Sequence, residues 1–105
     1  MAEKMVAALV TFELDSPLSV EEATAKFEST APNYRGLAHL ISKAYIRSDD
    51  GRTVGGFYVW DSREAAEAMY AGDWEQRVTA VYGVAPRLQY FDVPVLIENE
   101  RVAAS

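Results

Sequence analysis

Hydrophobic positions along this chain gather in short runs separated by polar turns, and the two clearest runs lie side by side at residues 37–48 and 53–60. Both are rich in β-branched and aromatic residues, which favour strands. Between them stands Asp50-Gly51, a dipeptide that suits the positive φ angles of a two-residue type I′ hairpin turn. The pattern predicts an antiparallel hairpin closed by this turn.

The turn also predicts the register of the hairpin. Counting outward from Asp50 and Gly51 places Lys43 opposite Tyr58 and Ile41 opposite Trp60, and opposed residues share a face of the sheet. One face then carries His39, Ile41, Lys43, Tyr45, Tyr58 and Trp60, and the other carries Leu40, Ser42, Ala44, Ile46, Phe57 and Val59. The first of these faces holds nearly all the chemically useful side chains.

Apolar and capping patterns before the hairpin predict one strand and one helix. The run from Met5 to Leu14 is apolar at both odd and even positions, which indicates a strand covered on both faces. Ser19 and Glu22 have the spacing of a capping box, so we expect a helix to start there. Its apolar stripe comprises Val20, Ala23, Phe27 and Ala31.

Two helical segments and a strand are expected after the hairpin. The first helix is capped by Asp61 or Ser62 and ends at Gly72; the second starts at Asp73-Trp-Glu-Gln76 and ends before Gly83. A fourth strand follows over residues 87–97. Its Pro94 cannot donate to a ladder, so this strand belongs at a sheet edge or a bulge.

The order strand, helix, strand, strand, helix, strand predicts an α+β, ferredoxin-like fold, in which both helical regions cover one side of an antiparallel sheet. We expect a single ferredoxin-like domain over residues 1–105, with an ordered core at about 5–98. The other side of the sheet keeps apolar side chains. A second copy of the chain is the simplest cover for it, so we expect a homodimer.

The amino-acid composition excludes several classes of function. The formal net charge is −6 and no basic run is present, which opposes nucleic-acid binding. The absence of Cys removes thiol chemistry, iron–sulfur clusters and Cys-ligated zinc, and a single His weakens any other metal site. No apolar run has the length of a membrane span and no secretory signal is evident, so we expect a cytoplasmic protein without metal or membrane contact.

The residues themselves resemble a known family over about Met5 to Asn99. The match rests on Leu40-Ile-Ser-Lys43, Tyr45, Asp50-Gly-Arg52, Gly55-Gly-Phe-Tyr58, Trp60, Glu64-Ala-Ala-Glu67, Tyr82-Gly83 and Phe91-Asp-Val-Pro94. These stretches are similar to the monooxygenases of the dimeric α/β-barrel superfamily, relatives of the antibiotic-biosynthesis monooxygenase domains. The resemblance implies a dimer in which two ferredoxin-like protomers join their sheets in a barrel.

The resemblance also implies a chemistry: a cofactor-independent monooxygenase that acts on a small aromatic or polyketide-like substrate, without flavin, metal or haem. Such a substrate reduces oxygen itself once deprotonated, so the protein binds the ring, stabilises an oxyanion and excludes water. Two alternatives stay open because fold alone does not select a function. One is a non-catalytic dimeric module for a hydrophobic small molecule, and the other is a haem-binding relative with His39 as axial ligand.

Eight residues are candidates for the site. In the catalytic set, Lys43 stabilises a phenolate, Tyr58 donates a hydrogen bond, Trp60 stacks on the ring and His39 takes the proton. The candidate substrate-binding residues are Phe27, Tyr45, Tyr70 and Trp74. Most of them also have a structural reading: Lys43 and Tyr58 as a cross-strand pair, the tryptophans as core and His39 as an exposed side chain. Tyr34, Tyr45 and Tyr70 fit either the mouth of a pocket or a dimer interface. His39 occupies a position where the family resemblance favours glycine.

Overall fold

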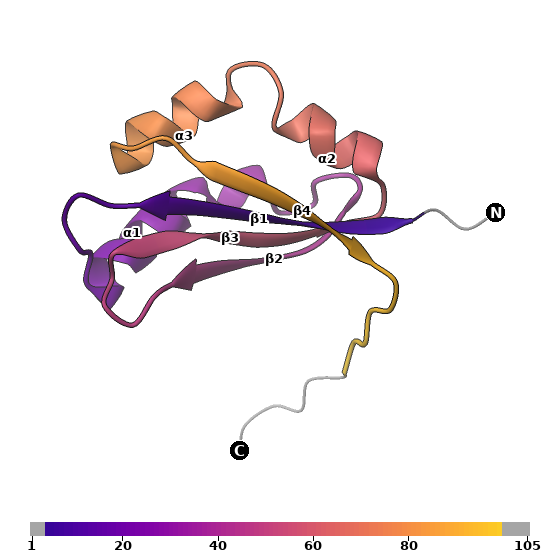
Figure 1. Cartoon of the computed structure of the whole chain (residues 1–105), viewed down its shortest axis with the longest axis horizontal. Coiled ribbons are helices and arrows are strands. Elements are labelled where there is room, and N and C mark those ends of the chain that lie inside the picture. Colours follow the sequence, from indigo (N-terminus) through magenta and orange to yellow (C-terminus); the bar gives the residue numbers. More distant parts are fainter. Residues whose placement is uncertain (1–3, 100–105) are drawn as a thin grey trace.

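The computed structural model of the chain describes residues 4–99, which contain four strands and three α-helices (Figure 1). In chain order the elements are β1 (Met5–Glu13), α1 (Val20–Thr30), a short 3₁₀ turn η1 (Ala31–Asn33), β2 (Leu40–Arg47), β3 (Thr53–Trp60), α2 (Arg63–Met69), α3 (Trp74–Tyr82) and β4 (Arg87–Val93). This order confirms the α+β, ferredoxin-like plan, with the second helical region divided into α2 and α3.

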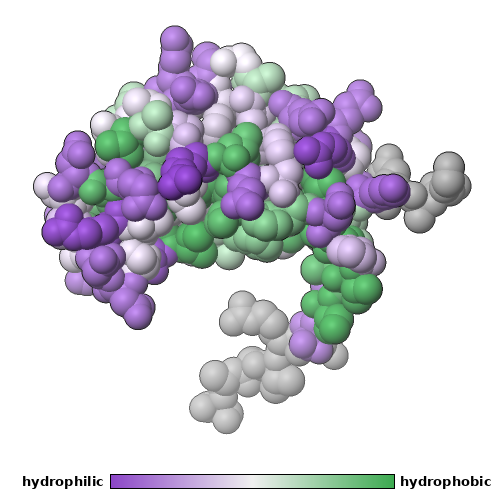
Figure 2. Space-filling model, in the orientation of Figure 1, coloured by the Kyte–Doolittle hydropathy of each residue, from purple (hydrophilic) through white to green (hydrophobic). Residues whose placement is uncertain are grey.

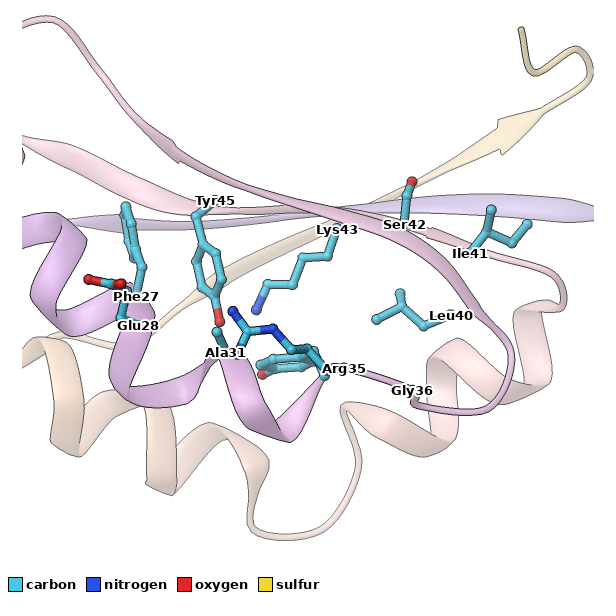
Figure 3. A pocket seen from close by; sticks show the side chains of 11 residues that line it. Phe27, Glu28, Ala31, Arg35, Gly36, Leu40, Ile41, Ser42, Lys43 and Tyr45 are labelled. Carbon is cyan, nitrogen blue, oxygen red and sulfur yellow. The ribbon is translucent and has the colours of Figure 1, made fainter. Parts of the chain in front are cut away.

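The four strands form one antiparallel sheet in the order β2-β3-β1-β4. The helices lie on one side of this sheet (Figures 1 and 3). β4 lies at an edge, as Pro94 predicts, although the strand ends at Val93 and does not continue to Ile97. The proline therefore stops the strand and does not interrupt it.

The hairpin register is confirmed at its centre and wrong at one end. Lys43 pairs with Tyr58, as counted from the turn, but Leu40 takes the place opposite Trp60 that we expected for Ile41. An irregularity between Leu40 and Ser42 inserts one extra residue, and such a bulge reverses the alternation beyond it. Leu40 consequently packs against the core, whereas Ile41 is 38% exposed.

The turn itself differs from the type I′ prediction. Gly51 has a φ of 74°, but Asp50 is not among the described residues with positive φ, and a type I′ turn requires both. The Gly51 N–H donates to the Ser48 carbonyl at 2.9 Å, and the Asp50 carboxylate accepts from the Arg52 N–H at 3.0 Å. The strands are thus joined by a four-residue loop that keeps the same register, because Ser48 still bonds to Thr53.

Helix α1 begins as its capping box predicts. The Glu22 N–H donates to the Ser19 hydroxyl at 3.1 Å and the Ser19 N–H donates to the Glu22 carboxylate at 2.9 Å. The predicted apolar stripe begins one turn later than expected, since Val20 is 58% exposed and Ala23 is the first buried position.

Helices α2 and α3 lie where the sequence predicts them, but the end of α2 and the cap of α3 differ from the prediction. Ser62, not Asp61, caps α2, and this helix ends at Met69, ahead of Gly72. Asp73 precedes α3 without capping it through its side chain, which instead accepts a bond from Arg77 at 3.0 Å. The end of α3 at a left-handed Gly83 is confirmed.

The sheet has two unlike faces. The helix side holds the main core, including Val10, Val54 and Trp60, each at most 1% exposed. On the opposite side, which we call the open sheet face, the ladder brings together apolar residues from three strands: Ala7, Leu9, Phe57, Val59 and Phe91. Phe57 is 40% and Phe91 41% exposed. Figure 2 shows apolar surface along the lower margin of the molecule, on the side of the sheet away from α2 and α3.

None of the helices within residues 4–99 combines the length and the apolar character that a membrane crossing requires.

Candidate functional site

Lys43 projects from β2 toward the helices and ends among three tyrosine rings. Its Nζ lies 3.3 Å from the ring centroid of Tyr34, 3.9 Å from that of Tyr45 and 4.5 Å from that of Tyr58. These rings come from the loop after η1, from β2 and from β3, and we call them the aromatic cage. The cage places a single amine against ring faces instead of against an anion.

Gly56 makes room for the stem of this lysine. A Cβ at position 56 would lie 3.1 Å from the Cε of Lys43 and 3.0 Å from the ring of Tyr58, which is tighter than ordinary carbon contacts. Any side chain there would displace the amine or the ring. Of the two readings of a glycine in a strand, close packing and ligand approach, the structure supports close packing.

An outer pocket of about 440 Å³ opens between α1, the loop after it and β2 (Figure 3). Its lining residues are Phe27, Glu28, Ala31, Tyr34, Arg35, Gly36, Leu40, Ile41, Ser42, Lys43 and Tyr45. Phe27 and Tyr45 stack with ring centroids 4.7 Å apart and form an aromatic wall. The pocket therefore unites three of the eight predicted residues: Phe27, Lys43 and Tyr45.

A much smaller inner cavity of about 30 Å³ adjoins the cage and is lined by Lys43, Tyr58, Trp74 and Tyr82 among others. Its size suits a single water molecule. The indole N–H of Trp74 is buried without a hydrogen-bond partner in the described part of the chain. The Trp74 N–H is thus free to donate a hydrogen bond to a small molecule such as water in this cavity.

Burial dominates the electrostatics of the cage. It lowers the pKa of Lys43 to about 7, because the ammonium loses hydration that no carboxylate replaces among residues 4–99. The ring faces attract the ammonium and oppose this effect in part. Burial raises the pKa of Tyr58 far above that of a free tyrosine and also raises that of Tyr45, where a 2.7 Å hydrogen bond with Thr30 acts in the opposite direction. Near neutral pH the lysine is therefore the group that exchanges a proton.

The other predicted aromatic residues lie behind the cage. Trp60 is 1% exposed, and its indole N–H donates to the Tyr70 hydroxyl at 3.2 Å. Tyr70 packs edge-on against Tyr58 at 5.5 Å and against Trp74 at 4.8 Å. Neither Trp60 nor Tyr70 lines the outer pocket, while Tyr58 and Trp74 reach only the inner cavity.

His39 lies away from both cavities. Its side chain is 56% exposed, and its Nδ1 lies 2.9 Å from the Asp61 carboxylate. The backbone of His39 has a φ of 71°, a left-handed conformation that glycine adopts without strain. This geometry gives a physical reason for the glycine that the family resemblance favours at this position.

Eight of the eleven residues that line the outer pocket are outside the predicted set, among them Glu28, Tyr34 and Arg35. Tyr34 and Arg35 belong to Asn33-Tyr-Arg-Gly36, which reads as a connecting loop in the sequence. The only local signal was an aromatic and a basic residue side by side within a turn.

Among residues 4–99, no group of three or more His, Asp or Glu side chains is arranged to hold a metal ion.

Comparisons with known proteins agree with this architecture. A family model described as "Putative mono-oxygenase ydhR" matches residues 8–96. No curated protein matches the chain. Among solved structures, SnoaB, a cofactor-independent oxygenase from Streptomyces nogalater, has a TM-score of 0.65 and 15% identity, covering 91% of this chain and 99% of its own.

Two further structures are similar to the same extent. A monooxygenase from Streptomyces coelicolor, solved with the ligand nanaomycin D, has a TM-score of 0.64 and 20% identity, with 93% of this chain and 94% of that chain covered. A haem-degrading protein from Mycobacterium tuberculosis has a TM-score of 0.66 and 18% identity, with 92% and 99% covered. At these identities the similarity establishes the fold, and function has to be argued from the site.

Proposed function

Because the chain belongs to this mono-oxygenase family, we propose that it is a cofactor-independent monooxygenase that oxidises a small phenolic or polyketide-like aromatic molecule in the outer pocket. The observation that carries the proposal is the amine of Lys43, which is partly buried among tyrosine rings, belongs to a residue that lines the pocket and has no salt-bridge partner in the described residues.

Lys43 supplies the proton chemistry in this proposal. Its neutral amine accepts the proton of a bound phenol, and the resulting ammonium stabilises the phenolate. The electron-rich phenolate then reduces oxygen. One oxygen atom enters the ring product and the other leaves as water, so the substrate supplies the electrons and no cofactor is consumed.

The pocket walls fit this role. Phe27 and Tyr45 offer stacked ring faces to a planar substrate, and Arg35 adds a second cation that can pair with a phenolate or carboxylate. His39, the other base considered from sequence, is paired with Asp61 outside the pocket. We therefore assign the proton transfer to Lys43.

Oxygen uptake by the purified, metal-free protein tests the proposal. A panel of anthrones and hydroquinones is added, and dissolved oxygen and product are followed together. We expect uptake in equal proportion to product and dependent on folded protein. No uptake above that of heat-denatured protein across the panel would overturn the proposed activity.

A non-catalytic binding module is the second candidate, and the open, aromatic outer pocket favours it equally well. The same panel separates the two, since a ligand raises the melting temperature of a binding module but no oxygen is consumed.

A haem-binding role for His39 has less support because this side chain bonds to Asp61 and lines neither cavity. A Soret band on haem titration that disappears in His39→Ala would revive it.

We also propose that the protein is a homodimer that pairs through the open sheet face. Support comes from the apolar residues of this face and from the 40–41% exposure of Phe57 and Phe91. Light scattering at micromolar concentration should give twice the chain mass. Phe57→Lys should give the monomer mass, while Val20→Lys, which changes a still more exposed apolar residue on α1, should leave the dimer intact. A monomeric wild type would contradict the proposal.

A further inference from the structure

The amine of Lys43 has the surroundings of a nucleophile. Its Nζ is held 3.3 to 4.5 Å from three ring centroids, and no described side chain forms a salt bridge with it. A lysine becomes nucleophilic in proteins when an apolar pocket desolvates it or when another cation lies nearby. The first condition holds here, because the three tyrosine rings surround the amine.

The pocket also gives this amine access to a ligand. Lys43 lines the outer pocket, and Figure 3 shows its side chain directed from β2 toward Tyr45 and Arg35. The lack of a side chain at Gly56 lets the stem lie flat against the sheet, so the amine is held in place by packing. The aromatic wall of Phe27 and Tyr45 selects for flat, unsaturated ligands.

We propose that Lys43 is a covalent attachment site for small aromatic aldehydes and ketones, which condense with its amine to form a reversible imine. The amine lone pair attacks the carbonyl carbon, a C–N bond forms, and a proton passes to the carbonyl oxygen to give a carbinolamine. Loss of water from the carbinolamine leaves the imine, and addition of water reverses the reaction. No oxidant or reductant is needed.

The protonation of the amine agrees with this chemistry, because burial lowers the pKa of Lys43 to about 7 and leaves a large neutral fraction at neutral pH. The titratable groups around the amine are the phenols of the aromatic cage, and Arg35 and Glu28 line the same outer pocket. This activity does not depend on oxygenation.

Reductive trapping tests the inference on the wild-type protein. The chain has three lysines, Lys4, Lys26 and Lys43, so two internal controls are present. The protein is incubated anaerobically with benzaldehyde and cyanoborohydride near neutral pH, and benzylated peptides are counted by mass spectrometry. We expect Lys43 to be modified at least about 10-fold faster than either control, as an activated amine should be. Equal or slower modification of Lys43 overturns the proposal.

A second aldehyde tests the ligand class. With acetaldehyde, which cannot stack on the aromatic wall, the preference for Lys43 over Lys26 should fall by at least about threefold. An equal preference for the two aldehydes would overturn the assignment to aromatic carbonyl compounds. Lys26→Arg is the matched control, because Lys26 donates to the Val81 carbonyl and does not line the outer pocket, so its loss should leave Lys43 labelling unchanged. Trapping without oxygen uptake, or uptake without trapping, separates this inference from the proposed oxygenase.

Discussion

Lys43 and His39 are four positions apart in the sequence, yet their surroundings are opposite. The lysine is partly buried among tyrosine rings and has no salt-bridge partner in the described chain, whereas the histidine side chain is 56% exposed and bonded to Asp61. Histidine is the usual side chain for proton transfer near neutral pH. Here burial lowers the pKa of Lys43 to about 7, so the lysine can transfer protons near neutral pH. The surroundings of the two side chains, and not their residue types, make Lys43 the candidate base and leave His39 outside the site.

The largest expected effect is on turnover. Lys43→Met keeps the length and apolar stem of the side chain but removes the amine, so the rate of substrate oxidation should fall by about 10²- to 10⁴-fold, the usual range for a general base. His39→Gln, the matched change at the exposed position, should stay within about twofold because it lies outside both cavities. Steady-state oxygen uptake measures both. Equal losses of activity in the two variants would contradict the assignment of proton transfer to Lys43 and not to His39.

The next effect is on the pH dependence of stability. The folded-state pKa of Lys43, about 7, lies below its unfolded value, so between these values the unfolded chain binds more protons and the free energy of unfolding rises with pH. From pH 7 to pH 9 the wild type should gain about 1 to 2 kcal/mol relative to Lys43→Met, after a discount for the solvent that still reaches the amine.

Urea denaturation at both pH values measures this gain. The raised pKa values of Tyr45 and Tyr58 keep these phenols protonated in the folded protein over this window. A wild type and a Lys43→Met variant with parallel pH profiles would show that the amine titrates as it does in water.

The smallest effect concerns the backbone at His39. His39→Gly and His39→Ala remove the same imidazole and the same bond to Asp61, but only glycine adopts a φ of 71° freely. The glycine variant should therefore be more stable than the alanine variant by about 1 kcal/mol. Thermal or urea unfolding of the pair supplies the comparison. An alanine variant as stable as the glycine variant would show that position 39 carries no strain.

Local rules predicted much of the fold. The reciprocal bonds of Ser19 and Glu22 depend on residues three positions apart, and the pairing of Lys43 with Tyr58 follows from counting across one turn. The errors also have local causes. The bulge after Leu40 moved Ile41 out of register with Trp60, and alternation alone contains no signal for an inserted residue.

The candidate site was predictable only in part. Lys43 and Tyr45 could be placed on one face because they alternate along one strand. Tyr34 and Arg35 could not, because they come from a loop whose path depends on how α1 packs on the sheet. Trp60, which looked available as a substrate platform, proved to be 1% exposed because Tyr70 and the helix layer cover it.

The order of elements, the centre of the hairpin and the edge position of β4 could be predicted from the sequence, because capping, alternation and the missing proline N–H act over a few neighbouring residues. The partial desolvation of Lys43 and the exposure of His39 depend instead on the tertiary fold. Desolvation depends on which distant segments pack over a side chain, and the ring of Tyr34 reaches Lys43 only when the chain folds back across the sheet.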